Sequence, residues 1–269
     1  MKLGPYLKKQ SLKIDRALDR YLPKKNERPV KLHEAMRYAV AGGGKRIRPI
    51  LVLEACRAVG GDERKVLPAA CALELIHNYS LVHDDLPCMD DDRFRRGRLS
   101  CHAKFSEETA VLAGDALLTL AFQLLSGPGG RTEATNRIAV AIGSRGMVGG
   151  QAVDMECQGK ELDLPTAEYI NTHKSGALIA ISLWTGATLG GGTPKRVESL
   201  FRYGKFVGLL FQIVDDIMDS QGYVQALSLA DAKKEALRLH RKAKAELPPF
   251  GRSGRVLGFI ADFLLTRDR

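Results

Sequence analysis

Two acidic clusters, each placed after an apolar segment, are the residues of this sequence best suited to chemistry. The first, DDLPCMDDDRFRRG, starts at Asp84 and has five carboxylates within nine residues, followed by three arginines. Carboxylates this close repel one another unless water solvates them or a shared cation neutralises them. Because most acidic runs are solvated surface, the first cluster indicates a site only if other residues complete it.

The second cluster, FQIVDDIMD, has the spacing of one helical face. Gln212, Asp215, Asp216 and Asp219 lie at positions i, i+3, i+4 and i+7, and apolar residues occupy the other faces. Carboxylates among such neighbours would be desolvated unless a cation neutralised them. A hard divalent cation with oxygen ligands is the simplest candidate.

The first cluster has a similar setting. An apolar segment runs into Asp84 and Asp85, and Pro87 then disfavours further helix. The resulting turn can return Asp90 toward the pair, while His77 lies seven residues before Asp84 and therefore on the same helical face. Two acidic pairs that each follow a long apolar helix favour a metal site over solvated surface. Because Mg²⁺ shares its ligand positions with phosphate oxygens, the two clusters predict a phosphorylated substrate.

Basic residues beside these clusters support the same substrate class. The segment GGGKRIRP places Lys45, Arg46 and Arg48 beside glycines that let a ligand approach the backbone, and Arg95 and Arg96 follow the first acidic cluster. A nucleic-acid patch is the alternative for KRIRP. The sequence lacks the aromatic interleaving of a single-strand binder and any zinc-finger or RNA-recognition signature. A small-molecule phosphate is therefore favoured over nucleic acid.

A further basic residue occurs in the segment HKSGAL. Lys174 and Ser175 are expected to open an apolar helix, whose first backbone N–H groups can receive an anion. Elsewhere, too, apolar residues recur three and four apart, glycine or proline marks the joins, and no sustained alternation indicates a sheet. We expect one all-α domain over residues 1–269. Its 45% hydrophobic content suits a large core, and its formal charge of +10 suits an anionic partner.

The five cysteines form no CxxC pair, so neither a disulfide framework nor a zinc knuckle is indicated and a cytoplasmic location is expected. The N-terminal residues have no signal-peptide core. The most apolar stretch, Ala177 to Leu189, is shorter than the roughly 18 to 20 residues that a spanning helix needs. We therefore expect a soluble protein without stable membrane insertion.

In combination, GGGKRIRP, HNYSLVHDDLPCMDDDRFRRG, LAGDALL, HKSGAL and GLLFQIVDDIMD resemble the trans-isoprenyl diphosphate synthases, in particular the bacterial farnesyl and geranylgeranyl diphosphate synthases. The resemblance implies a class I prenyltransferase helical bundle around a central cavity, usually a homodimer. It also implies a head-to-tail condensation of isopentenyl diphosphate with an allylic diphosphate such as dimethylallyl or geranyl diphosphate. Mg²⁺, three ions per active site, would assist the loss of the allylic diphosphate.

The resemblance also implies roles for residues in the matching motifs. Asp84, Asp85 and Asp90 would bind Mg²⁺ at the allylic diphosphate, and Asp215 would complete the metal site from the opposite wall. The residues implied in holding the allylic diphosphate are Arg95, Lys174, Ser175 and Gln212. The residues implied in holding isopentenyl diphosphate are Lys45, Arg48, His77 and Arg96. Of these, Asp84, Asp85, Lys174 and Arg95 would act most directly in the reaction.

Product length should depend on what closes the hydrocarbon pocket. Tyr79 and Ser80 precede Asp84 by five and four residues, about one helical turn. In the family a bulky aromatic residue at the position of Tyr79 limits elongation, which favours the C15 product, farnesyl diphosphate. Geranylgeranyl diphosphate, the C20 product, is the main alternative, and an ordinary core role is the alternative for Tyr79.

One feature departs from the family pattern. After Asp219, the segment DIMDSQGYVQALSLADAKKEA passes almost directly to a helix expected to begin near Tyr223, where the family usually has a further loop. If that loop is truly deleted, a lysine that contacts the allylic diphosphate in the family is absent as well. A non-catalytic subunit of prenyl synthase type therefore stays open as an alternative. A terpene cyclase is disfavoured, because a cyclase needs no isopentenyl diphosphate site.

Overall fold

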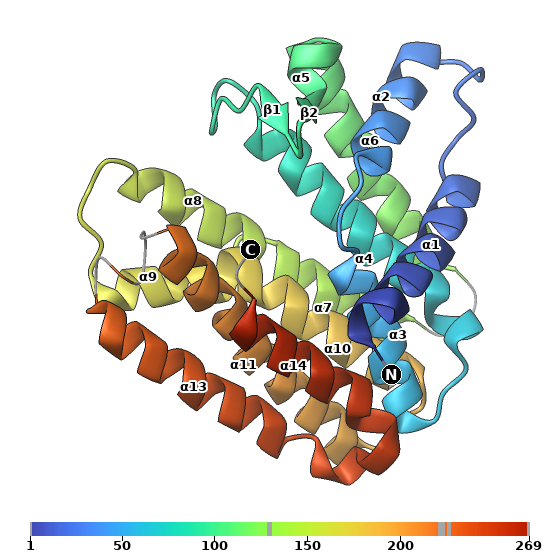
Figure 1. Cartoon of the computed structure of the whole chain (residues 1–269). Coiled ribbons are helices and arrows are strands. Elements are labelled where there is room, and N and C mark those ends of the chain that lie inside the picture. The colour runs from blue at the N-terminus through green and yellow to red at the C-terminus, as the bar shows by residue number, and fades with distance from the viewer. Residues whose placement is uncertain (1, 128–130, 220–223, 225–226, 268–269) are drawn as a thin grey trace. The chain divides into compact units, whose positions relative to one another are not determined.

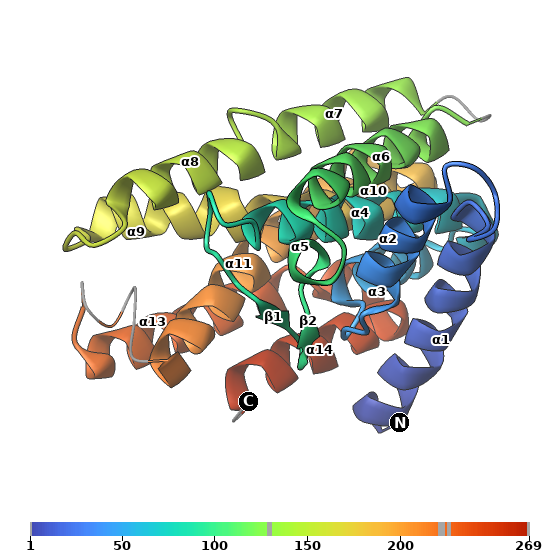
Figure 2. The ribbon, with the colours of Figure 1, turned by 90° about the horizontal axis from the view of Figure 1, so that it is seen from above.

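The structure is a computed structural model, which describes residues 2–127, 131–219, 224 and 227–267. Figure 1 and Figure 2 show that helices dominate the chain. In the described residues the strands are β1 (Phe94–Arg95) and β2 (Arg98–Leu99), which pair antiparallel with Phe94 opposite Leu99. The expected all-α class is confirmed. The small hairpin was not predicted from the sequence.

By its internal contacts the chain divides into two compact units, each discontinuous in sequence. The first unit comprises Met1–Ile50 and Leu67–Arg131, and the second comprises Leu51–Val66 and Thr132–Arg269. The acidic cluster at Asp84 belongs to the first unit. The cluster at Asp215 belongs to the second.

The first unit is built from amphipathic helices around buried aliphatic residues. On α1, Ile14, Ala17 and Leu18 are buried at helical spacing, and α6 packs against both α2 and α5. The side chain of Ser106 caps α6 by accepting a hydrogen bond from the amide of Thr109. The helices of this unit are α1 (Leu3–Tyr21), α2 (Val30–Ala41), the start of α3 (Ile47–Val59), most of α4 (Glu63–Asp84), α5 (Cys101–Lys104) and α6 (Glu107–Leu125).

The second unit has the buried helix α10 (Ala177–Leu189) at its centre, and α10 is apolar on nearly every face. It packs on α11 (Pro194–Asp219) and on α7 (Thr132–Ile142), while α13 (Leu229–Ala245) packs on the other side of α11 (Figure 1). The remaining helices are α8 (Met147–Cys157), α9 (Leu164–Ile170), the π-helical segment η1 (Asn171–Gly176), the 3₁₀ segment η2 (Pro248–Gly254) and α14 (Arg255–Thr266).

Glycines allow these helices to approach closely. A Cβ atom on Gly204 of α11 would lie 2.7 Å from the Cα of Ala180 on α10. A Cβ atom on Gly186 of α10 would lie 2.1 Å from the carbonyl oxygen of Val52. Both distances are shorter than van der Waals contact. Helix α10 can therefore pack this closely only because glycine, which has no Cβ atom, occupies these two positions.

The expected contraction after Asp219 involves residues 220–223 and 225–226, which lie outside the described residues, as does the expected helix start near Tyr223. The described helix that follows is α13, which begins at Leu229 and is capped by the side chain of Ser228.

One helix in the described part of the chain is long and apolar enough to cross a membrane by length and composition, namely α6. Only 33% of the residues in its apolar window are buried. Such a helix is weak evidence for a membrane span, because core helices of soluble proteins pass the same test. It is nevertheless longer than the stretch Ala177 to Leu189 that the sequence singled out.

The glycine contacts lead to a stability prediction. Gly186→Ala should lower the free energy of unfolding by about 1–3 kcal/mol, because the added methyl group displaces the backbone of Val52. Gly4→Ala is the matched control: a Cβ atom on Gly4, which lies in α1, would have no other atom within 4 Å, so this change should be neutral or stabilising by up to about 1 kcal/mol. Urea unfolding followed by circular dichroism measures both. Equal effects of the two substitutions would contradict the packing account.

Candidate active site

The turn after α4 brings part of the first acidic cluster together. The amide of Asp90 donates to the carbonyl oxygen of Asp84 at 2.9 Å, and the amide of Asp91 donates to that of Leu86 at 3.1 Å. Asp91 adopts a φ of 51°, in the left-handed region where aspartate is tolerated. The turn that Pro87 predicts therefore returns Asp90 to the end of the helix.

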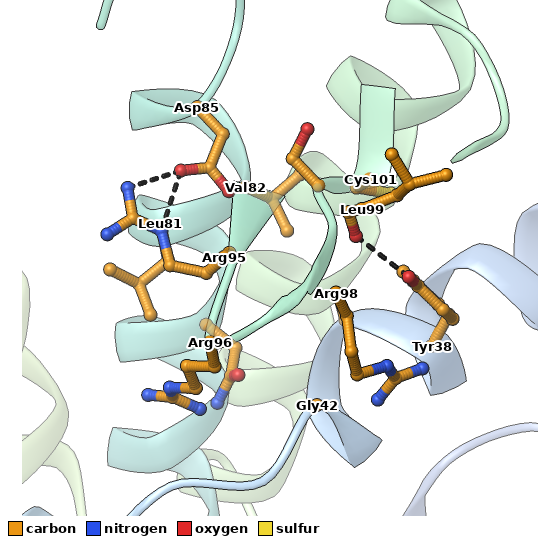
Figure 3. A pocket seen from close by; sticks show the side chains of 13 residues that line it. Tyr38, Gly42, Leu81, Val82, Asp85, Arg95, Arg96, Arg98, Leu99 and Cys101 are labelled. Atoms are coloured by element: carbon orange, nitrogen blue, oxygen red, sulfur yellow. Dashed lines mark hydrogen bonds and ion pairs between the residues drawn. The ribbon is translucent and has the colours of Figure 1, made fainter. Parts of the chain in front are cut away.

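Arg95 neutralises the most buried carboxylate of this cluster. Its Nε donates to Oδ1 of Asp85 at 2.8 Å, and its Nη2 donates to the same oxygen (Figure 3). The same Nη2 also pairs with Asp92 at 2.9 Å. Asp85 is only 3% exposed, and this burial raises the pKa of its carboxyl group, while the positive charge of Arg95 opposes the rise. The acidic and basic residues that follow one another in the sequence thus form an ion pair within the first unit.

The hairpin that carries Arg95 is attached to α2. The hydroxyl of Tyr38 donates to the carbonyl oxygen of Leu99 at 2.7 Å, and the guanidinium of Arg98 lies 4.2 Å from the Tyr38 ring centroid. Arg96 and Gly97, at the hairpin tip, both have positive φ, as a two-residue turn of this twist requires. A pocket of about 40 Å³, which has room for ordered water beside Asp85, is lined in part by Tyr38, Arg96, Arg98 and Leu99 (Figure 3).

Three basic residues predicted to hold isopentenyl diphosphate influence one another in the structure. Burial, with a smaller contribution from the charge of Arg96, lowers the pKa of Arg48 to about 10, although the charge of Glu74 opposes the fall. Burial and then the charges of Arg48 and Arg96 lower the pKa of His77 well below its ordinary value. The buried Nε of Arg48 has no hydrogen-bond partner among the described residues. An unpaired buried donor among mutually repelling cations fits an anion.

The glycine-rich loop makes room for one of these cations. The Nη1 of Arg96 donates to the carbonyl oxygen of Gly43. A Cβ atom on Gly44, whose φ is 129°, would lie 2.6 Å from the guanidinium of Arg96. The sequence suggested that these glycines admit a ligand, whereas in the structure they admit an arginine. Lys45, the fourth predicted residue of this group, is exposed on the same loop.

Arg46 has a different role from the one that its position in GGGKRIRP suggested. Its side chain is buried and donates to Glu74 at 2.7 Å, to Asp15 at 2.8 Å and to the carbonyl oxygen of Val40 at 2.6 Å. Its guanidinium therefore serves the core of the first unit and is not available to a phosphate. Sequence patterning could not separate it from Arg48, two residues further along, because both lie in the same basic motif.

In the second unit, the two aspartates of the second cluster have different partners. Asp215 pairs with Nη2 of Arg267 at 2.6 Å, and Asp216 accepts a hydrogen bond from Asn171 at 3.3 Å. Arg267 also donates to the carbonyl oxygen of Phe211 at 2.9 Å and lies 4.1 Å from the Phe211 ring centroid. The side chain of Asp215 is 32% exposed, so it is less desolvated than the sequence suggested.

Lys174 does not open a helix, which corrects the sequence prediction. It lies in η1, and α9, η1 and α10 follow one another without a break from Leu164 to Leu189. Because the preceding turn continues the helical ladder, the amides at Lys174 and Ser175 are not free helix-terminal donors. The ammonium group of Lys174 instead pairs with Asp154 of α8 at 2.5 Å.

Sequence reasoning missed two residues near Lys174. Asp154 and Gln151 lie three residues apart on α8, and both polar atoms of the Gln151 side chain are buried without a partner in the described residues. A Cβ atom on Gly150 would lie 2.3 Å from the amide nitrogen of Lys174, so the glycine allows α8 to approach η1 closely. The segment GGQAVD, with glycines before two polar residues on one helical face, was the available signal.

The remaining predicted residues occupy defined places. Tyr79 is 7% exposed, and its ring lies edge-on to His83 with a centroid distance of 5.8 Å. The hydroxyl of Ser80 donates to the carbonyl oxygen of His77 at 3.0 Å, which ties this side chain to its own helix. Gln212 lies on α11 one turn before Asp215 and is partly buried.

The carboxylates suit magnesium in chemistry. Within the described residues no group of three or more histidine, cysteine, aspartate or glutamate side chains is gathered as for a closed metal cage. Mg²⁺ usually takes one or two carboxylates and completes its shell with water and substrate phosphates. The oxygen donors of Asp84, Asp85 and Asp90, joined by one turn, fit that mode of binding.

An all-helical chain with two aspartate pairs at helix ends and a basic cluster in the unit of the first pair has the features of an isoprenoid synthase. The family model described as "Polyprenyl synthetase" matches residues 29–230, and the chain belongs to this family.

Relatives with high similarity carry different product names. The chain is 42% identical to a farnesyl diphosphate synthase of Geobacillus stearothermophilus over 290 positions, covering 98% of this chain and 97% of the relative. It is 41% identical to a chloroplastic geranylgeranyl pyrophosphate synthase of Capsicum annuum, covering 98% and 78%. The crystal structure of an FPP/GFPP synthase from Zymomonas mobilis matches with a TM-score of 0.93 and 39% identity, covering 98% and 99%.

The first of these alignments also bears on chain length. Its 290 positions exceed the 269 residues of this chain, so part of the Geobacillus protein has no counterpart here. A contraction after Asp219, as expected from the sequence, would make this chain shorter than its relative in the same way.

The lowered pKa of His77 leads to a prediction on pH. The imidazole should be neutral at pH 7 and should remain so below its ordinary pKa of about 6.5. The unfolded chain then binds a proton that the folded chain does not, so this contribution to stability is present above about pH 6.5 and is lost as the pH falls toward the folded pKa. Nuclear magnetic resonance of ¹⁵N-histidine-labelled protein measures the titration, and His77→Asn identifies the signal. A midpoint near 6.5 would contradict the account.

Proposed function

We propose that the protein is a magnesium-dependent prenyltransferase that condenses isopentenyl diphosphate head-to-tail with an allylic diphosphate. Membership of the polyprenyl synthetase family supports the reaction class. The single observation that carries the substrate class is the basic group of Arg48, His77 and Arg96, in which the buried Nε of Arg48 has no partner in the part of the chain that the structure describes. A diphosphate would satisfy this donor and relieve the repulsion between the cations.

The proposed metal ligands are the carboxylates of Asp84, Asp85, Asp90 and Asp215, and we propose three Mg²⁺ ions. When bound, the metal neutralises the charge that develops on the departing diphosphate. Asp85 and Asp215 each pair with an arginine, Arg95 and Arg267 respectively. In this proposal Arg95 and Arg267 each hold one carboxylate in place, and the magnesium ions would share these carboxylates with the arginines.

The proposed substrate contacts divide into two sets. Isopentenyl diphosphate is assigned to Lys45, Arg48, His77 and Arg96. The allylic diphosphate is assigned to Arg95, Lys174, Ser175 and Gln212. The pairing of Lys174 with Asp154 supports a positioned ammonium group, because a lysine side chain held by a carboxylate loses less freedom when it receives a phosphate oxygen.

The chemistry follows from charge. The allylic C–O bond breaks with its electron pair leaving on the diphosphate, whose charge Lys174 and Arg95 stabilise together with the metal. The double bond of isopentenyl diphosphate then attacks the allylic cation and forms the new C–C bond. A proton leaves the resulting cation, and the released diphosphate is the proposed acceptor. His77 is neutral in the folded protein, so it can hold a diphosphate oxygen as an N–H donor without adding a further positive charge.

We propose farnesyl diphosphate as the main product, with geranylgeranyl diphosphate as the alternative. The buried Tyr79, one helical turn before the acidic pair, supports a short hydrocarbon pocket, with Ser80 beside it. The named relatives include makers of both chain lengths, so they do not discriminate between the two products.

We also propose that the protein forms homodimers in the cytoplasm. The exposed apolar side chains of Val111 and Leu112 on α6, 40% and 55% exposed, support self-association through that helix. All five cysteines are free, which suits a reducing compartment. Sedimentation of the purified protein measures its mass, and a monomer at micromolar concentration would contradict the dimer.

The function is tested by incubating purified protein with Mg²⁺, labelled isopentenyl diphosphate and, separately, dimethylallyl, geranyl and farnesyl diphosphates. We expect a C15 product from the two shorter starters. Asp84→Ala and Asp215→Ala should each lower turnover by about 10²–10³-fold, because charge on the leaving group is no longer neutralised. Glu161→Ala, which removes an exposed carboxylate, is the matched control and should retain full activity. Binding of isopentenyl diphosphate without any product would instead support a non-catalytic subunit.

Product length gives a separate prediction. Tyr79→Ala should shift the product distribution toward C20 and longer, because removing the ring opens space one helical turn below the acidic pair. Tyr79→Phe keeps the ring and should leave the product unchanged. Chromatography of dephosphorylated products measures the distribution. If Tyr79→Ala leaves the product length unchanged, another residue closes the pocket.

A further inference from the structure

The second unit carries a groove that contains none of the residues assigned to the two diphosphate substrates. Helices α10 and α11 form its floor, and α7 and α13 form its walls; in Figure 1 these helices follow one another in the order α13, α11, α10, α7. Its volume is about 730 Å³, which is within the range of small-molecule sites.

The floor of the groove is apolar. Ala177, Ala180 and Ile181 contribute from α10, and Phe201 and Leu209 contribute from α11. Ala180 lies where the two helices pack closely, since a Cβ atom on Gly204 would lie 2.7 Å from its Cα atom. Neither phenylalanine of this groove, Phe201 or Phe206, is fully buried. An apolar chain lying on this floor would remove their exposed area from water.

The rim of the groove is basic. Five arginine and lysine side chains line it against two glutamates, and the lining residues with charge are Arg137, Arg145, Lys205, Arg238, Lys242, Glu168 and Glu235. Arg137 pairs with Glu133, and Arg238 pairs with Glu235. Arg145, Lys205 and Lys242 form no ion pair with another residue in the described ranges. Three such cations, placed around an apolar floor, favour a ligand whose head group carries more than one negative charge.

The two lysines are placed above the aromatic part of the groove. The Nζ of Lys205 lies 4.6 Å from the ring centroid of Phe201, one helical turn earlier on α11. The Nζ of Lys242, from α13, lies 5.6 Å from the ring centroid of Phe206. Each ammonium therefore stands where an apolar chain on the floor would end in a polar head.

We infer that this groove is a second binding site for a prenyl diphosphate, with the hydrocarbon chain on the floor and the diphosphate between Lys205 and Lys242. This inference rests on the proposed function, because a prenyl diphosphate is the amphiphile that such an enzyme itself releases. A diphosphate head matches the rim in charge better than a single carboxylate does. Thr172, His173 and Gly176 of η1 also line the groove, so its occupant touches the segment that carries Lys174.

The single tryptophan of the chain provides a local readout. Trp184 on α10 is 4% exposed, and the guanidinium of Arg137, a residue of the groove wall, lies 4.6 Å from its ring centroid. Titration of the protein with farnesyl diphosphate in the presence of EDTA should change the Trp184 fluorescence in a saturable manner. No turnover is needed, so a failure of the proposed reaction and a failure of this inference are distinguishable.

The decisive comparison uses two double variants with the same change of charge. Lys205→Glu with Lys242→Glu should weaken the fluorescence-detected binding at least tenfold. Lys233→Glu with Arg241→Glu, on exposed positions of α13 outside the groove, should leave it unchanged. Circular dichroism checks that both variants keep the helical fold.

Three outcomes would overturn the inference. The first is an unchanged Trp184 signal with farnesyl diphosphate. The second is equal binding in the two double variants, which would mean that general surface charge attracts the ligand. The third is binding of palmitate that is as tight as binding of farnesyl diphosphate. This result would mean that the rim does not select a diphosphate head and that the ligand of the groove is a fatty acid.

Discussion

The buried guanidinium of Arg46 is the interaction on which the geometry of the first unit depends. Removing a charge from water costs several kcal/mol, and only a full set of partners offsets that cost. Arg46 has such a set, because α1 supplies Asp15, α4 supplies Glu74 and α2 supplies the carbonyl oxygen of Val40. Since these partners come from three helices, they hold the loop before α3 in a single position. That position fixes where the neighbouring Lys45 and Arg48 can lie.

Arg48, His77 and Arg96 show the opposite design. The charges of Arg48 and Arg96 repel each other, and burial lowers the pKa of all three side chains. A folded chain tolerates such a group only if other interactions maintain it, and here the Arg46 pairs hold the loop, Gly43 receives Arg96, and Tyr38 holds the hairpin. The unfavourable free energy of this cluster is relieved when an anion binds. The same logic, in weaker form, applies to the three cations on the rim of the groove in the second unit.

Local features of the site followed from the sequence, whereas partners distant in sequence did not. The turn at Pro87 is local, so its effect on Asp90 could be predicted. The face shared by Gln212 and Asp215 is also a matter of helical period. The carboxylate partners of Arg46 and the arginine partner of Asp215 lie 28 to 52 residues away in sequence, and no periodicity encodes such pairs.

Two further features were hidden for chemical reasons. The hairpin at Arg96 and Gly97 has strands of only two residues each, too short to show an alternating pattern, and its stability comes from the turn and from Tyr38. The segment HKSGAL looked like a helix start because polar residues precede an apolar run. In fact α9 continues into it, since the cap lies earlier, at Asp163, whose side chain accepts from the amide of Thr166.

The π-helical segment between α9 and α10 makes the second unit sensitive to helical phase. A π-turn accommodates one residue more than the α-helical turn that it interrupts. If a single residue were deleted within Asn171–Gly176, the ladder could become regular, and the residues on one side would rotate by about 100° relative to those on the other. Lys174 would then turn away from Asp154, or Ala180 of α10 would turn away from Gly204 of α11. The length of this one segment therefore keeps two helical faces, one polar and one apolar, in their separate orientations.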